Sequence, residues 1–272
     1  MRYGSKKADG TYSINSAVIF CDALNNRNPM LINSFLDFLK ECERLVFTEF
    51  KPTRNALNNV RGNWYEWLIA VGYIHFKNAY IDPNRHLVQL PNIKSLDYMS
   101  LYHEDIYRFI KDLRLKTKNY ANLISSNPDF VIINNVPNLK IPNVTNVTQS
   151  TIQEIESIHN QLTGKLSFDD LIGFLSVKTS LRPDRRIQLS HEGALAKAFY
   201  EHLKGRLWKI NAPGLKYYAA AMEVKNSDRS GLRTVATHSI LSVNSVPEPA
   251  VNDVFEIKSG AELSDLFTKV LI

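Results

Sequence analysis

The segment from Leu171 to Glu192, LIGFLSVKTSLRPDRRIQLSHE, holds an apolar strand pattern followed by a dense group of charged side chains. Its apolar first part indicates a central β-strand over 171–179, and apolar residues at helical spacing predict a helix over 188–204. Because side chains alternate along a strand, Ser176 and Lys178 are expected on one face. A strand, a lysine, an Arg-x-Asp-Arg cluster and a glutamate therefore follow one another within one short stretch.

Apolar periodicity predicts further helices and strands on both sides of this segment. The expected helices cover 30–46, 63–80, 97–116, 151–162 and 261–271, and the expected strands cover 130–133, 216–224 and 233–242. This alternation predicts an α/β fold with helices flanking a mixed central sheet. We expect one domain over 1–272, with a mainly helical N-terminal part to about residue 120 and the core from about residue 121.

The composition is that of a folded chain with a modest basic excess. Of 272 residues, 44% are hydrophobic and 22% charged, and 33 Lys and Arg against 27 Asp and Glu give a net charge of +6. Such an excess is compatible with a polyanionic partner without requiring one. No apolar run approaches the roughly 18 residues that span a bilayer, and the N-terminus lacks a signal-peptide pattern. We therefore expect a soluble, cytoplasmic protein without a membrane partner.

Two glutamates stand on apolar helix faces. Glu192 has Leu189, Ala196 and Phe199 at helical spacing, and Glu66 is placed in the same way within the helix predicted over 63–80. Burying an unpaired carboxylate costs several kcal/mol or more, so each needs a cation, a metal ion or a raised pKa. A structural ion pair and a functional site are both compatible with this pattern.

A third carboxylate, Asp129, follows Pro128 at the start of the strand predicted over 130–133. A turn aspartate would look the same in the sequence. Taken together, Asp129, Glu192 and Glu66 could hold a hard divalent cation, with Lys178 beside a scissile phosphate to stabilise charge or orient the attacking water. Oxygen ligands without a histidine or cysteine cluster favour Mg²⁺ over zinc.

The Arg-x-Asp-Arg cluster suits recognition of base edges. Arginine makes bidentate contacts to guanine O6 and N7, and aspartate accepts from cytosine N4. Arg182, Asp184 and Arg185 lie just before the predicted helix over 188–204, where a helix end could enter the major groove. A symmetric dimer using the cluster once per subunit would recognise four G·C pairs as a palindrome. The alternative is a surface salt-bridge cluster.

These residues carry a resemblance to a known family. Pro128-Asp129, Ser176-x-Lys178, Arg182-x-Asp184-Arg185 and Glu192 together resemble the CCGG-family type II restriction endonucleases, a branch of the PD-(D/E)XK nucleases. In that branch the acidic residue that usually lies two positions before the lysine is on a neighbouring helix, and serine occupies the original position. Ser176 and Glu192 would fit this exchange. The segment from Gly62 to Ile69, with Glu66, resembles the part of the family that supplies an additional active-site glutamate. Further likeness, which covers most of the chain, lies in residues 11–17, 126–130, 216–221 and 234–240.

The resemblance implies more than the spacing does. It points to the members that cut R/CCGGY, with Mg²⁺ as cofactor, a mixed sheet of about five strands, and homotetramers or dimers of dimers that engage double-stranded DNA containing CCGG. Such members are prokaryotic enzymes that leave four-base 5′ overhangs. By the same likeness Arg206 and Trp208 would lie near the tetramer contact, although a strand packing Trp208 against the core is also compatible with the sequence.

Other assignments remain open at the level of sequence. Glu223 and Lys225 form an orthodox E-x-K at the end of the strand predicted over 216–224, so a nuclease built from Asp129, Glu223 and Lys225 is an alternative. We prefer Lys178, because its neighbourhood also supplies Glu192 and the candidate base readers. A structure-selective repair or junction nuclease of the same fold, or a DNA-binding protein without catalysis, would share many of these features.

Overall fold

The computed structural model describes residues 1–79, 85–93, 96–118, 120, 126–134, 136–144, 146–240 and 246–272. The chain forms two compact units, and each unit is assembled from segments that are distant in the sequence. The first contains 1–83, 141–156 and 256–272, and the second contains 84–140 and 157–255. The expectation of one endonuclease domain divided near residue 120 stays a prediction.

The first unit is mainly helical. Its elements are β1 (Gly4–Lys6), β2 (Tyr12–Ile14), α1 (Ser16–Leu24), the 3-10 helix η1 (Pro29–Leu31), α2 (Phe35–Phe47), α3 (Arg54–Ala79), α5 (Gln149–Ser157) and α8 (Gly260–Leu271). Trp64 and Tyr65 of α3 are fully buried, and the Tyr65 hydroxyl donates to the Ile257 carbonyl at 2.9 Å. A hydrogen bond of this kind satisfies the phenol inside an apolar core.

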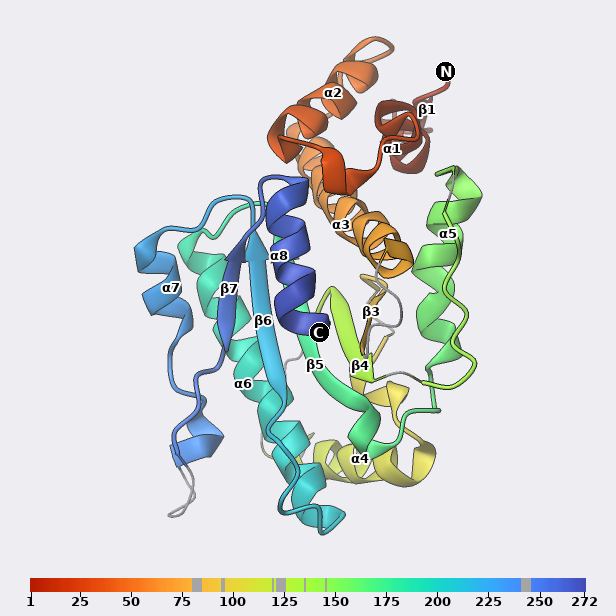
Figure 1. Ribbon diagram of the computed structural model, residues 1–272. Coiled ribbons are helices and arrows are strands. Elements are labelled where there is room, and N and C mark those ends of the chain that lie inside the picture. Colours follow the sequence, from red (N-terminus) through yellow and green to blue (C-terminus); the bar gives the residue numbers. More distant parts are fainter. Residues whose placement is uncertain are drawn as a thin grey trace. The chain divides into compact units, whose positions relative to one another are not determined.

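The second unit contains a five-stranded sheet in the order β3-β4-β5-β6-β7 (Figure 1). The strands are β3 (Arg85–Gln89), β4 (Phe130–Asn134), β5 (Leu171–Lys178), β6 (Lys216–Ala221) and β7 (Asp253–Glu256). β3, β4 and β5 pair antiparallel, whereas β5 and β6 pair parallel, so the sheet is mixed. The predicted α/β architecture with a mixed five-stranded sheet flanked by helices is confirmed.

One face of this sheet is covered by α4 (Glu104–Lys118) and α6 (Pro183–Arg206). Alternation directs Phe174 of β5 and Tyr217, Ala219 and Ala221 of β6 toward this face. The same alternation directs Ser176, two residues beyond Phe174, toward α6. The sheet therefore presents the end of β5 to the helix that carries Glu192.

The remaining elements of the second unit are short. They are the 3-10 helices η2 (Tyr98–Leu101), η3 (Ile158–Gln161), η4 (Phe168–Asp170) and η5 (Thr237–Ile240), and the helix α7 (Asn226–Leu232).

No helix in the described part of the chain is long and apolar enough to cross a membrane.

Several predicted elements differ from the structure. The strand predicted over 233–242 is wrong in its described part, because a single bridge between Val235 and Pro249 is followed by η5, while residues 241–245 lie outside the described chain. The helix predicted over 30–46 begins only at Phe35, where the Ser34 hydroxyl accepts from the Asp37 N–H at 3.2 Å and caps the helix. The helices predicted over 97–116 and 151–162 are each divided between an α-helix and a 3-10 turn.

Candidate active site

The candidate site lies at the end of β5, where two predicted residues, Asp129 and Lys178, meet. The Asp129 carboxylate, at the start of β4, accepts through Oδ2 from the Val177 N–H at 2.6 Å and from Lys178 Nζ at 3.0 Å. The backbone carbonyl of Asp129 also accepts from the Leu90 N–H at 2.9 Å, beyond the end of β3. Pairing on both sides of β4 therefore fixes this aspartate against the strand that carries the lysine.

Asp129 keeps one oxygen available. The residue is only 6% exposed, and Val177 and Lys178 both donate to Oδ2, so neither of these contacts uses Oδ1. This oxygen is therefore suited to an additional ligand.

Glu192 of α6 is 5% exposed and is surrounded by neutral donors. Gln188 Nε2 donates to Oε1 at 2.7 Å, and the Ser126 hydroxyl donates to the same oxygen. The Tyr217 hydroxyl donates to Oε2 at 2.8 Å, with Ser176 Oγ further away at 3.5 Å. No lysine or arginine forms an ion pair with Glu192 among the described residues, so the hydrogen-bond donors that surround this buried carboxylate are all neutral.

Ser176 and Tyr217 connect the glutamate to the sheet. Ser176 is fully buried and shares a hydrogen bond of 2.8 Å with the Tyr217 hydroxyl. Burial first, and the charge of Glu192 second, raise the pKa of Tyr217 well above its ordinary value. The phenol therefore stays protonated and remains a donor to the carboxylate.

A close helix contact positions this glutamate. A Cβ added to Gly193 would lie 2.3 Å from the Ala250 carbonyl oxygen, which is closer than a real Cβ comes to another atom. The absence of a side chain at 193 therefore lets α6 pack against this backbone, beside the residue that bears the carboxylate.

The alternative E-x-K is placed differently. Glu223 and Lys225 follow the end of β6, with side chains 70% and 71% exposed, and they pair with each other at 3.7 Å. No described contact joins either of them to Asp129. The geometry therefore favours Lys178 as the partner of Asp129.

Glu66 lies on α3 of the first unit. Its side chain is half-buried, which corrects the expectation of a buried carboxylate. The residues at helical spacing from it, Ile69, Ala70, Tyr73 and Ile74, are buried, so the predicted apolar face is present and only the carboxylate itself is less buried than expected. Glu66 and the pair of Asp129 and Glu192 belong to different units.

Candidate metal ligands in this site are oxygen atoms. Within the described ranges, no group of three or more His, Cys, Asp or Glu side chains is arranged to hold a metal ion. Asp129 Oδ1 and the Glu192 carboxylate nevertheless fit a hard cation in chemistry, because both are carboxylate oxygens of buried residues and Glu192 lacks an ion-pair partner among the described residues.

The candidate base readers lie at the N-terminus of α6. Arg182 and Asp184 are exposed and pair at 3.3 Å, and Arg185 Nε lies 4.0 Å from the same carboxylate. Arg186 instead pairs with Asp228 of α7 at 3.2 Å. The exposed cluster thus lies within three turns of Glu192 on one helix.

Arg206 and Trp208 lie at the other end of α6. Trp208 is 84% exposed and adopts a left-handed backbone conformation with φ of 56°, just after the helix ends. The expectation of a strand that packs Trp208 against the core is therefore wrong. Arg206 is exposed and its guanidinium lies 6.0 Å from the centre of the Phe109 ring.

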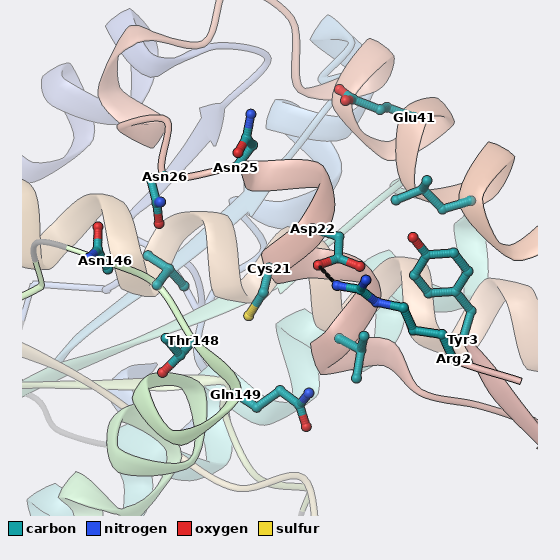
Figure 2. Close-up of a pocket in the computed structure, with 13 residues that line it drawn as sticks. Arg2, Tyr3, Cys21, Asp22, Asn25, Asn26, Glu41, Asn146, Thr148 and Gln149 are labelled. Atoms are coloured by element: carbon teal, nitrogen blue, oxygen red, sulfur yellow. Dashed lines mark hydrogen bonds and ion pairs between the residues drawn. The ribbon is translucent and has the colours of Figure 1, made fainter.

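A cavity of about 900 Å³ lies in the first unit and contains none of these residues. Arg2 and Asp22 pair at 2.7 Å and line it together with Asn25 and Asn26, which follow α1 (Figure 2). Its lining is a mixture of amides, an ion pair and apolar groups. The carboxylates at the end of β5 belong to the second unit.

Sequence reasoning missed three residues of the site: Ser126, Gln188 and Tyr217. Gln188 could have been found from its position four residues before Glu192 on a helix, where side chains are neighbours. Tyr217 is in a strand whose alternation was predicted, but its pairing beside Ser176 depends on the parallel register of β5 and β6.

The mixed sheet, the aspartate and lysine pair at its end and the buried glutamate on the next helix occur in a chain whose relatives identify it as a type II restriction endonuclease, a site-specific deoxyribonuclease. A family model described as "Cfr10I/Bse634I restriction endonuclease" matches residues 3–272. The chain belongs to the Cfr10I/Bse634I restriction endonuclease family.

Known proteins match over nearly the whole chain. The Type II restriction enzyme Cfr10I of Citrobacter freundii is 39% identical over 282 residues, with 98% of each protein covered. The structure titled "Crystal structure of Type IIF restriction endonuclease Bse634I with cognate DNA" superposes with a TM-score of 0.89 at 28% identity, covering 99% of this chain and 97% of that one. A second structure, "Bse634I restriction endonuclease", gives a TM-score of 0.88 at 29% identity, covering 98% and 96%.

Proposed function

We propose that this restriction endonuclease makes Mg²⁺-dependent double-strand cuts at a palindromic site with a CCGG core, R/CCGGY, leaving four-base 5′ overhangs. The observation that carries the proposal is the grouping of Asp129 and Lys178 at the end of β5 beside Glu192 of α6. The relatives support it, since the match extends over almost the entire chain.

Each residue of the site has a proposed role. Asp129 and Glu192 hold the metal ion, with Glu66 as an additional carboxylate, and Ser176 supports Glu192 in place of an acidic side chain. When bound, Mg²⁺ polarises a phosphoryl oxygen and lowers the pKa of bound water. Lys178, held 3.0 Å from Asp129, stabilises negative charge on the scissile phosphate.

Recognition is assigned to Arg182, Asp184 and Arg185. The two arginines contact guanines and the aspartate accepts from cytosine N4, so that each subunit would recognise two G·C pairs. The exposure of Arg182 and Asp184, 64% and 63% for their side chains, supports this role, because a base edge needs access to them. The binding partner is double-stranded DNA containing CCGG, in the cytoplasm of a prokaryotic cell.

Arg206 and Trp208 are assigned to a contact between subunits of a homotetramer. An indole that is 84% exposed, beside Ile210 at 69%, is an unusual surface for an isolated subunit. A bulky residue at φ of 56° is also strained, and such strain is commonly retained where it serves a function.

Digestion of a sequenced plasmid in Mg²⁺ tests the proposed function. The expected result is a discrete set of fragments whose mapped ends all lie at R/CCGGY with four-base 5′ extensions, and no cutting in EDTA. Cuts that follow branched or mismatched structures would instead indicate a repair or junction nuclease. Binding without cleavage at any Mg²⁺ concentration would indicate a DNA-binding protein.

A further inference from the structure

One side chain connects the candidate base readers to the candidate metal ligands. Arg185 Nη1 donates to Gln188 Oε1 at 3.0 Å, and Gln188 Nε2 donates to Glu192 Oε1 at 2.7 Å. Positions 185, 188 and 192 lie on one face of α6, because three and four residues each make about one helical turn. A single amide therefore joins two residues that have different proposed roles.

The chemistry fixes the orientation of this amide. A guanidinium can only donate hydrogen bonds, and an ionised carboxylate can only accept them. Only one orientation of the Gln188 amide satisfies both neighbours, with its oxygen toward Arg185 and its nitrogen toward Glu192. Reversing the amide would break both contacts, so the two contacts hold each other in place.

Arg185 can keep this contact while it binds a base. A guanidinium has five N–H donors, and a bidentate contact to guanine O6 and N7 uses two of them. The bond from Nη1 to Gln188 occupies one more. The amide can therefore orient the guanidinium before DNA arrives and remain bonded afterwards.

We propose that Gln188 is a positioning residue that couples guanine recognition by Arg185 to the alignment of the Glu192 carboxylate, an inference that rests on the roles in the proposed function. Placement of the Arg185 guanidinium on its base fixes the amide, and the amide fixes Glu192 Oε1. A misplaced guanidinium, as on a noncognate base, releases the amide and loosens the carboxylate. Discrimination would then appear in the cleavage rate as well as in binding.

Two variants separate the halves of this bridge. Gln188→Glu keeps an acceptor for Arg185, removes the donor to Glu192 and puts a second carboxylate beside it. Gln188→Lys keeps a donor toward Glu192 and removes the acceptor for Arg185. Two adjacent carboxylates share a proton more readily, so the pH profile of cleavage in Gln188→Glu should move to higher pH.

The first measurement is the rate of single-turnover cleavage of a cognate duplex as a function of pH. The second is the binding of cognate and singly substituted duplexes, measured by fluorescence anisotropy in EDTA at one salt concentration. We expect Gln188→Glu to lose about 10- to 100-fold in cleavage at neutral pH while binding discrimination changes less than about threefold. In Gln188→Lys we expect binding discrimination at one G·C pair to fall by about tenfold or more.

Glu201→Gln, an exchange of carboxylate for amide on the same helix, is the matched control and should keep wild-type behaviour in both measurements, as Glu201 pairs with Lys204 outside the bridge. A wild-type rate and pH profile in Gln188→Glu, or equal loss of discrimination in both Gln188 variants, would overturn the coupling. Failure of the wild-type protein to cut at R/CCGGY would instead refute the proposed function. Thermal unfolding midpoints identify any variant that does not fold, and the other variant then carries the test.

Discussion

Arg182 is free to turn toward DNA, because its contact to Asp184 at 3.3 Å is an exposed ion pair of small energetic value. If it makes a bidentate contact to guanine, Arg182→Ala should weaken cognate binding by about 1–3 kcal/mol and relax discrimination at one G·C pair. Competition binding with singly substituted duplexes measures both effects. Equal weakening on every sequence would show that Arg182 contacts only phosphate.

Tyr217 supplies a buried hydroxyl to Glu192 at 2.8 Å. Tyr217→Phe removes this donor while keeping the ring, so the Glu192 carboxylate should lose alignment and cleavage should fall roughly 10- to 100-fold. Single-turnover rates over a range of Mg²⁺ concentrations measure the effect. Tyr120→Phe is the control, since Tyr120 is 92% exposed. Wild-type cleavage by Tyr217→Phe would mean that the phenol does not position the carboxylate.

The residues of the site differ in how far the sequence could predict them. Lys178 and Glu192 follow from strand alternation and helix periodicity, which are local patterns. Asp129 and Val177 are 48 positions apart in the sequence, and their contact depends on the antiparallel pairing of β4 and β5. From the sequence, Asp129 could be grouped with Lys178 and Glu192 only by the chemistry of the side chains and by the resemblance to a family.

At the scale of elements, the contact of α6 with the backbone at Ala250 determines where Glu192 lies. Gly193→Ala would place a Cβ 2.3 Å from the Ala250 carbonyl oxygen, so the helix must shift. We expect a loss of about 1–3 kcal/mol in the free energy of unfolding and roughly a hundredfold slower cleavage. Urea unfolding and single-turnover cleavage measure the two effects.

Gly205→Ala is the matched control on the same helix. A Cβ at Gly205 meets no atom within 4 Å, and alanine favours a helix over glycine by up to about 1 kcal/mol. This variant should be as stable as wild type or more so, and should cut normally. Equal effects of the two substitutions would refute a specific role for the contact at Gly193.

The elements also show what local patterns can predict. β4, β5, β6 and α6 have long or strongly periodic apolar patterns, and the structure contains each of them. β3 and β7 were not predicted, because RHLVQ and DVFE each contain only two consecutive apolar residues, and such strands acquire their definition from pairing with a neighbour in the sheet. The strand predicted over 233–242 is wrong because β-branched residues alone do not make a strand. Among the described residues of this segment, only Val235 forms a bridge to another segment, and no ladder of paired residues follows.

For the whole molecule, the exposed indole of Trp208 predicts a contact between subunits. If the proposed tetramer forms, Trp208→Ala should convert it to a smaller species, with little change in thermal stability of the subunit, because the residue is 84% exposed. Sedimentation velocity at several protein concentrations measures the assembly. Leu31→Ala, at a residue that is 78% exposed, is the control for loss of a surface apolar group. An unchanged assembly in Trp208→Ala would remove Trp208 from the interface.

The central claim is that the chemistry takes place at the end of β5 and not at the E-x-K that follows β6. The most direct measurement compares Lys178→Ala with Lys225→Ala in Mg²⁺-dependent cleavage of a cognate duplex, with binding measured in parallel. We predict that Lys178→Ala binds the duplex specifically but cuts at least roughly a hundred- to a thousandfold more slowly, and that Lys225→Ala cuts like wild type. Cleavage by Lys178→Ala together with its loss in Lys225→Ala would contradict the claim.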